Sequence, residues 1–164
     1  GTDRHSPWPR AEESAVGDAS EIVGRARIHR ERMAVAADHL EEALARPAGN
    51  LSGWKTAVQA AVIELSDALA AHVHEVEGAG GLYDDIMSRA PQLEHRISEL
   101  RHDHDDLRGH IAELEPILAE RAAPEQVARV RDLGVALLAE LSRHRHKGAD
   151  LVWDSYDYDI GAGD

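Results

Sequence analysis

Apolar residues recur at steps of three and four along most of the chain, and this spacing predicts helices. The stripes span 22–44, 58–76, 93–114 and 127–151. The breaks between them read "RPAGN", "GAGG" with the short segment "LYDDIMS" behind it, and "ERAAPE". Short connections favour antiparallel neighbours. The predicted fold class is therefore all-α, an antiparallel up-down-up-down four-helix bundle.

The two ends of the chain lack this rhythm. Residues 1–19 carry two prolines and mixed charge without periodicity, which predicts a flexible N-terminal arm. Residues 154–164, "DSYDYDIGAGD", form a polar C-terminal tail. The four-helix bundle is expected over 20–153.

Composition and charge exclude several classes of protein. The chain has no cysteine, so disulfides, thiolate zinc sites and cysteine nucleophiles are excluded. A net charge of −13 argues against nucleic acid and anionic membranes as partners. No stretch approaches the roughly 18 apolar residues of a membrane span, and no signal peptide is visible, so we expect a cytoplasmic protein.

Each of the four apolar stripes contains one histidine, in a chain with eleven histidines. At about 1.5 Å per residue, the distances of these histidines from the helix breaks place them in one layer of the bundle. Leaving each buried imidazole unsatisfied costs about 1–3 kcal/mol. Something must therefore hold the ring nitrogens, either a metal ion or a dense polar network, and the sequence favours the metal. The four are His29, His72, His104 and His144.

Two carboxylates are the candidates to complete a metal site. Glu77 lies five residues after His72, and Asp150 lies six after His144. Neither spacing is the i+4 step that keeps two side chains on one face, so a wider helical turn, loosened by Gly78 or Gly148, is needed to bring the acids inward. The alternative is that both are solvated surface acids. Glu75 and Asp154 are reserve candidates.

Three His-x-His pairs occur on the predicted helices. Two residues span about 200° of a helix, so only one histidine of each pair can face the core. Periodicity selects His72, His104 and His144 as the inward members, and the outward partners are His74, His102 and His146.

Four stretches resemble the hemerythrin-like (HHE cation-binding) family: "IHRERM", "HVHEVEGAGGLYDDI", "APQLEHRISELRHDHDDL" and "RHRHKGADLVWDSYDYDIGAGD". The resemblance spans about residues 22–160. It implies a four-helix bundle that holds two non-haem iron ions with histidine and carboxylate ligands. The ligands it implies here are His29, His72, Glu77, His104, His144 and Asp150.

The sequence also departs from the family pattern. The helix-two carboxylate is displaced by one residue, the helix-four acid is displaced as well, and Leu100 stands where a second helix-three histidine is usual. The departures leave open two irons with fewer imidazoles, one metal, or none. Tyr83 and Tyr156 are further candidate ligands.

Two functions are expected from these residues. The first is a non-haem di-iron protein that binds or reacts with O₂ or a related small oxidant, as a carrier, a sensor or a peroxide- or O₂-reactive oxidoreductase. The second is a metal-responsive or structural helical module that acts through protein partners without oxidant chemistry.

Overall fold

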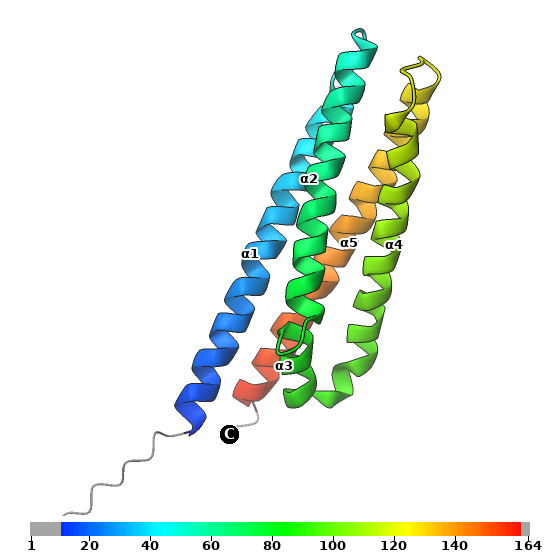
Figure 1. Cartoon of the computed structure of the whole chain (residues 1–164). Helices are drawn as coiled ribbons and strands as arrows, with labels where there is room; N and C mark the ends of the chain where they lie inside the picture. The colour runs from blue at the N-terminus through cyan, green and yellow to red at the C-terminus, as the bar shows by residue number, and fades with distance from the viewer. Residues whose placement is uncertain (1–10, 162–164) are drawn as a thin grey trace, which may run out of the picture.

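Four long helices run side by side in the computed structural model of the chain, with a short helix at one end (Figure 1). The structure describes residues 11–161, with side chains from 19 to 156. This part of the chain contains no strand, so the all-α prediction is confirmed. The elements are α1 (Ala11–Ala45), α2 (Leu51–Glu77), α3 (Leu82–Arg89), the 3-10 helix η1 (Pro91–Leu93), α4 (Glu94–Ala119) and α5 (Gln126–Gly161).

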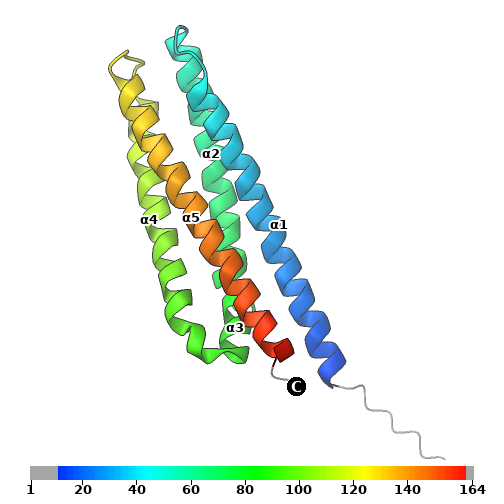
Figure 2. The same ribbon diagram turned by 180° about the vertical axis from the view of Figure 1, so that it is seen from behind.

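The long helices form two hairpins that pack on each other. Helix α1 packs on α2 and α4 on α5, while α2 also contacts α4 and α1 contacts α5. The turns that close the two hairpins lie at the same end, and α3 lies at the other (Figures 1 and 2). This arrangement is compatible with the predicted antiparallel up-down-up-down bundle.

Both outer helices are longer than the sequence pattern predicts. Helix α1 begins at Ala11, inside the expected arm, because "AEESAVGDAS" is rich in helix-forming Ala and Glu. Helix α5 continues to Gly161, past the expected start of the tail at 154, and buried Ser155 extends its buried stripe by one turn beyond Leu151. Residues 1–10 and 162–164 of the predicted arm and tail lie outside the described residues.

The glycine-rich stretch after α2 ends that helix instead of letting it continue. Gly78 is extended, with a ψ of 157°, and Gly80 has a φ of +72°, a backbone region that favours glycine. A Cβ atom at Gly81 would lie 2.3 Å from the carbonyl oxygen of Glu75. The chain therefore turns tightly here, and α3 begins as a separate helix.

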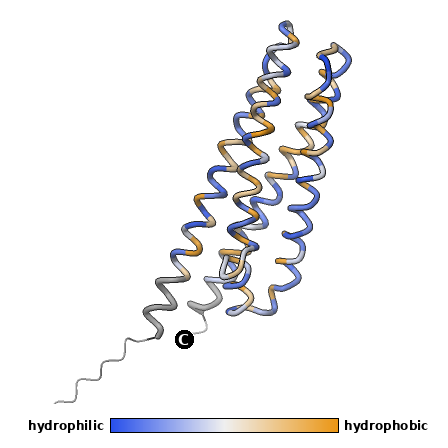
Figure 3. The backbone as a smooth tube through the Cα atoms, viewed as in Figure 1, coloured by the Kyte–Doolittle hydropathy of each residue, from blue (hydrophilic) through white to orange (hydrophobic). Residues whose placement is uncertain are grey.

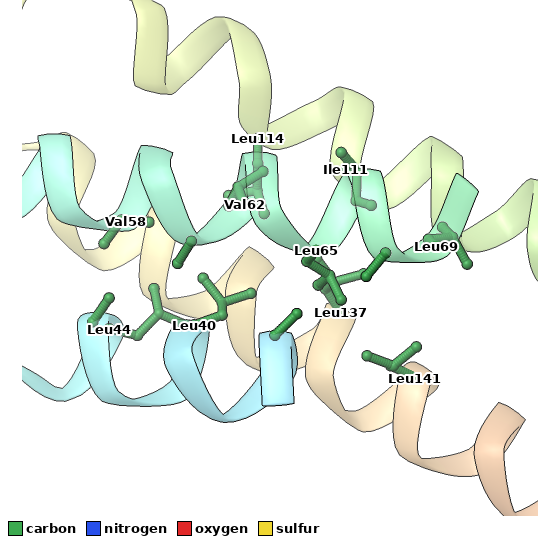
Figure 4. Packing of buried hydrophobic residues seen from close by; sticks show 14 of the residues in the cluster. Leu40, Leu44, Val58, Val62, Leu65, Leu69, Ile111, Leu114, Leu137 and Leu141 are labelled. Carbon is green, nitrogen blue, oxygen red and sulfur yellow. The ribbon is translucent and has the colours of Figure 1, made fainter. Parts of the chain in front are cut away.

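Hydrophobic and polar residues alternate along every long helix, as Figure 3 shows. None of the helices over 11–161 combines the length and apolar character needed to cross a bilayer. The buried apolar residues form two clusters. One fills the half of the bundle towards the hairpin turns (Figure 4) and includes Met33, Leu40, Val58, Val62, Leu65, Leu69, Leu107, Leu114, Leu137 and Leu141. The other lies against α3 and includes Val76, Tyr83, Ile86, Leu100 and Leu151.

Two cations satisfy helix ends near the hairpin turns. Buried Lys55 donates a hydrogen bond from Nζ to the carbonyl oxygen of Glu120, 2.6 Å away. Arg131 donates to the carbonyl oxygens of Leu44 and Arg46 at 3.1 and 2.9 Å. The last carbonyls of a helix have no partner within it, so these bonds tie α2 to the end of α4 and α5 to the end of α1.

Candidate metal centre

Three histidines from three helices are buried in one layer between the two apolar clusters. His72 on α2, His104 on α4 and His144 on α5 are 4%, 0% and 3% exposed. Each takes the place of an apolar residue in its stripe, so the packing that buries leucine elsewhere buries imidazole here. The other members of the His-x-His pairs are exposed. The inward histidine of each pair is thus the one that helical periodicity selects.

The ring nitrogens of these histidines converge. His144 Nε2 lies 3.1 Å from His104 Nε2 and 3.5 Å from His72 Nε2. One ring nitrogen from each residue lies within 4.8 Å of the other two. Around an ion with metal–nitrogen bonds of about 2.1 Å, adjacent ligands are about 3.0 Å apart in an octahedron and about 3.4 Å apart in a tetrahedron. The two nitrogen–nitrogen distances, 3.1 and 3.5 Å, are therefore close to the spacing between adjacent ligands in these two geometries.

Carboxylates lie behind two of the rings. His144 Nδ1 donates to Asp103 Oδ2 at 3.1 Å, and His104 Nδ1 lies 3.4 Å from Glu77 Oε1. Lys147 Nζ donates to both oxygens of the Asp103 carboxylate, at 3.3 and 3.2 Å. The Asp103 carboxylate fixes the proton of His144 at Nδ1 and leaves the Nε2 lone pair of that ring free, as in most protein metal sites with histidine ligands. The Nε2 atoms of His104 and His144 face each other across the centre.

Burial keeps the imidazoles neutral. Burial, and then the nearby His104 and His144, lower the pKa of His72 to about 2. Burial and the neighbouring His144 likewise lower the pKa of His104 to about 3. Burial also lowers the pKa of His144, although Asp103 opposes this shift. Because a metal binds only the unprotonated ring, protons do not compete with a cation here near neutral pH.

A tyrosine covers one side of the layer. The ring of Tyr83 on α3 is stacked on His104, with 6.2 Å between centroids and 8° between planes. Burial, and then the charge of Glu77, raise the pKa of Tyr83. The phenol is therefore neutral. Its apolar ring covers the site, and its hydroxyl is the polar group at the edge of the ring.

A cavity of about 10 Å³ adjoins the layer, with all five α-helices contributing to its wall. This is the space of about one water molecule. His72, His144, Tyr83 and Arg30 line it, and the rest of its wall is mostly apolar: Ala26, Met33, Val76, Leu82, Leu100 and Leu151. The space beside the histidine layer can thus hold a very small molecule and is too small for a large one.

Histidine 29, the fourth predicted ligand, does not join the other three. Its Nε2 lies 4.0 Å from Glu75 Oε2, while its buried Nδ1 has no hydrogen-bond partner within the described residues. Arg25 donates from Nε to Glu75 Oε1 at 2.8 Å. Glu75, a reserve candidate, therefore joins α2 to α1 beside the histidine layer.

The two predicted carboxylate ligands lie outside the ring of converging nitrogens. Glu77 is the last residue of α2, and its carboxylate lies between His104 Nδ1 and Arg101, the latter 3.7 Å away. Asp150 is exposed on α5. The cause is spacing: the wider turn that would rotate them inward is absent, because α2 ends at Glu77, directly before Gly78, and α5 stays helical through Gly148.

The remaining reserve candidates are engaged elsewhere. Asp154 accepts a hydrogen bond from Arg96 Nη1 at 2.7 Å. The hydroxyl of Tyr156 donates to Asp85 Oδ2, and the guanidinium of Arg89 lies over the Tyr156 ring. These contacts join α5 to α3 and α4 at the end of the bundle.

Asp103, behind the ring of His144, is a site residue that the apolar periodicity of the sequence does not predict. Although burial alone would raise its pKa, hydrogen bonds from His144 and Lys147 lower it, so the carboxylate is charged behind the ring. The available signal was its position directly before His104: it lies at the edge of the inward face of α4, where an acid can reach the neighbouring helix.

Comparisons of the chain with protein-family models, with curated proteins and with solved structures each found no match. The hemerythrin-like resemblance therefore stays a prediction that rests on the residues described above.

Proposed function

We propose that this chain is a hemerythrin-like non-haem iron protein, built on an up-down-up-down four-helix bundle, that binds or reacts with O₂ or a related small oxidant. The observation that carries the proposal is the convergence of three buried, neutral imidazoles, two of them backed by carboxylates. Imidazole suits iron as well as zinc and copper, and the three nitrogens come from separate helices, as in metal sites of helical bundles.

A cation explains the geometry of the ring nitrogens. If His104 Nδ1 carries its proton towards Glu77, as His144 Nδ1 does towards Asp103, the Nε2 atoms of both rings present lone pairs, 3.1 Å apart. Two facing lone pairs at that distance repel in a dry interior, and an ion held between them turns the repulsion into attraction.

The chain's own residues have distinct roles in this proposal. His72, His104 and His144 hold the iron, while Asp103 and Glu77 orient the rings behind it. Bound iron supplies an open coordination position at which a small oxidant can bind or be reduced. The cavity of about 10 Å³ beside His72 and His144 limits access to molecules of about the size of water or O₂.

A second iron per chain, which completes the di-iron proposal, requires further ligands. His29 and Glu75 offer them, because the buried Nδ1 of His29 lacks a partner in the described residues and Glu75 Oε2 lies 4.0 Å from Nε2 of the same ring. Glu77, next to His104, is the acid best placed to bridge, whereas Asp150 on the exposed face of α5 would need α5 to rotate.

The first experiment is anaerobic loading with ferrous iron, followed by metal analysis and absorption spectra before and after exposure to air. We expect stoichiometric iron and new visible or near-ultraviolet bands in air. Close to one iron per chain assigns the three-imidazole site alone, and close to two requires His29 and Glu75 as well. Stable oxygen uptake indicates a carrier, and turnover of hydrogen peroxide indicates an enzyme. A colourless protein without bound iron refutes the proposal.

The His-x-His pairs provide a matched control for the ligands. The double variant His72→Gln/His144→Gln removes two converging rings, and His74→Gln/His146→Gln removes two exposed rings from the same turns of the same helices. We expect the first variant to lose the iron and the second to keep it. Equal iron content in both variants contradicts the assignment.

One observation favours a second function, a structural or metal-responsive module that acts through protein partners. If His104 and His72 carry their protons on Nε2, the contacts of 3.1 and 3.5 Å to His144 Nε2 can be hydrogen bonds, and the Nε2 atoms have partners without a metal. This function predicts that iron, if bound, raises the stability of the bundle without producing any reaction with O₂ or peroxide.

A further inference from the structure

A second hollow lies on the surface between α1 and α5, outside the histidine layer. Its volume is about 340 Å³. Three arginines, Arg27, Arg30 and Arg145, contribute to its wall. The other residues of the wall are Glu31, Ala34, His146 and Ala149.

Two of these arginines stand between the outer hollow and the inner cavity. Arg30 on α1 and Arg145 on α5 line both spaces, so their side chains separate solvent from His72 and His144. Both residues are partly buried. Neither guanidinium makes a hydrogen bond or ion pair with any other residue in the part of the chain that the structure describes.

The local charge is opposite to that of the whole chain. The protein carries −13, yet the only carboxylate in the wall of the outer hollow is Glu31, which lies 3.5 Å from Arg27. Burial lowers the pKa of Arg30, and the charges of Arg27 and then Arg145 lower it further, while Glu31 opposes them. Like charges are therefore gathered here, and an anion between them would relieve the repulsion.

We propose that Arg30 and Arg145 form a binding site for a small oxyanion at the mouth of the cavity beside His72 and His144. Two guanidinium groups facing one hollow from two helices offer forked donors to the oxygens of one ion. The inner cavity holds only about one water molecule, so the anion stays at the arginines and does not enter the histidine layer. This site needs no metal.

The ligand class follows from the donors and the space. Arginine pairs bind planar carboxylate-like anions and tetrahedral phosphate-like anions with comparable geometry. We therefore choose nitrite as the planar probe and inorganic phosphate as the tetrahedral probe. Chloride at matched ionic strength serves as the background, since exposed charges are screened by salt.

The test is calorimetric titration of the metal-free full chain, in the presence of a chelator, with each anion in turn. We expect saturable binding of one anion per chain for at least one probe. The variants Arg30→Gln and Arg145→Gln each weaken it by about tenfold or more, as expected for the loss of a charge-assisted pair. Because the protein is metal-free, this result is independent of whether it binds iron.

Matched controls lie close by on the same two helices. Arg32→Gln and Arg143→Gln make the same change of charge at exposed positions that line neither space. We expect them to change the affinity by less than about twofold. Arginine side-chain nitrogen spectra of the unaltered protein give a second measurement that needs no variant, with the signals of Arg30 and Arg145 shifting on titration. No saturable binding of either anion, or equal weakening by the control variants, overturns the proposal.

Discussion

Two regions of the bundle share the same helical spacing of buried residues: the apolar half near the hairpin turns and the layer of histidines. Burial has opposite effects on the free energy of folding in the two regions. Near the turns, leucine and valine from four helices pack together, as Figure 4 shows for Leu40, Val62, Leu114 and Leu137. One turn further along, the same stripes present imidazoles. The apolar half gains free energy by leaving water. In the layer, ring nitrogens lose their water and find incomplete partners.

This difference shows where the free energy of folding and the chemistry of the site reside. His72 Nδ1 and His104 Nδ1 are buried without a hydrogen-bond partner in the described residues, and each such group costs about 1–3 kcal/mol. The apolar halves on either side hold the layer closed despite this cost. The two regions should therefore respond differently to substitution and to pH.

The largest expected effect is in the apolar half. Leu65 is 1% exposed, so Leu65→Ala should lower the free energy of unfolding by about 2–5 kcal/mol through lost burial and a residual cavity. Urea unfolding followed by circular dichroism measures the change. Ile63→Ala, on the exposed side of the same helix at 55% exposure, should stay within about 0.5 kcal/mol. If the two variants are equally destabilised, the apolar half is not packed as described.

Acid should act on the histidine layer instead. The pKa of His72 is about 2 and that of His104 about 3 in the folded chain, against about 6.5 when unfolded. Between these values the unfolded chain binds more protons, so the stability that the neutral rings contribute is complete above about pH 6.5 and is lost as pH falls. For the metal-free protein the limiting slope is about 1.4 kcal/mol per pH unit for each histidine.

The pH prediction has its own control. Urea unfolding of the metal-free protein between pH 7 and pH 5 gives the slope, and the variant His72→Leu/His104→Leu should remove most of it. A slope that persists in this variant would show that the loss of stability comes from other groups.

The smallest of these effects sharpens the role of the carboxylate behind His144. Asp103→Asn keeps an acceptor but loses the charge, so we expect iron affinity to fall by about tenfold, or about 1.4 kcal/mol, with little change in fold stability. Competition with a coloured chelator measures the affinity. Asp105→Asn, at an exposed acid two residues away that pairs with Arg108, should leave it unchanged. Equal loss in both variants would indicate a general effect of charge.

Most of the fold follows from periodicity in the sequence. Apolar steps of three and four specify the long helices, and the breaks at "RPAGN" and "GAGG" fall where α1 and α2 end. The ends of the outer helices were less predictable. Helix α1 starts in a stretch that has helix-forming residues but no apolar rhythm, and α5 continues because Ser155, a polar residue, is buried.

The candidate site could be predicted only in part. Periodicity identifies the inward rings of His72, His104 and His144, because burial on a helix depends on angular position alone. It does not resolve whether His29, which is also on a stripe, reaches the same point across the bundle. That depends on the axial offset of α1 and on Glu75, which lies against its ring.

The histidine layer also connects segments that are distant along the chain, and this has a consequence for folding kinetics. His104 and His144 are 40 residues apart and meet when the α4–α5 hairpin closes, whereas His72 is 72 residues from His144 and joins only when the α1–α2 hairpin docks. The α4–α5 hairpin alone thus offers a cation two of the converging imidazoles, and the complete bundle offers three. A ligand that binds only the native state reports on the population that can bind it. The rate at which the third imidazole becomes available to a cation during refolding therefore measures how fast one hairpin docks on the other.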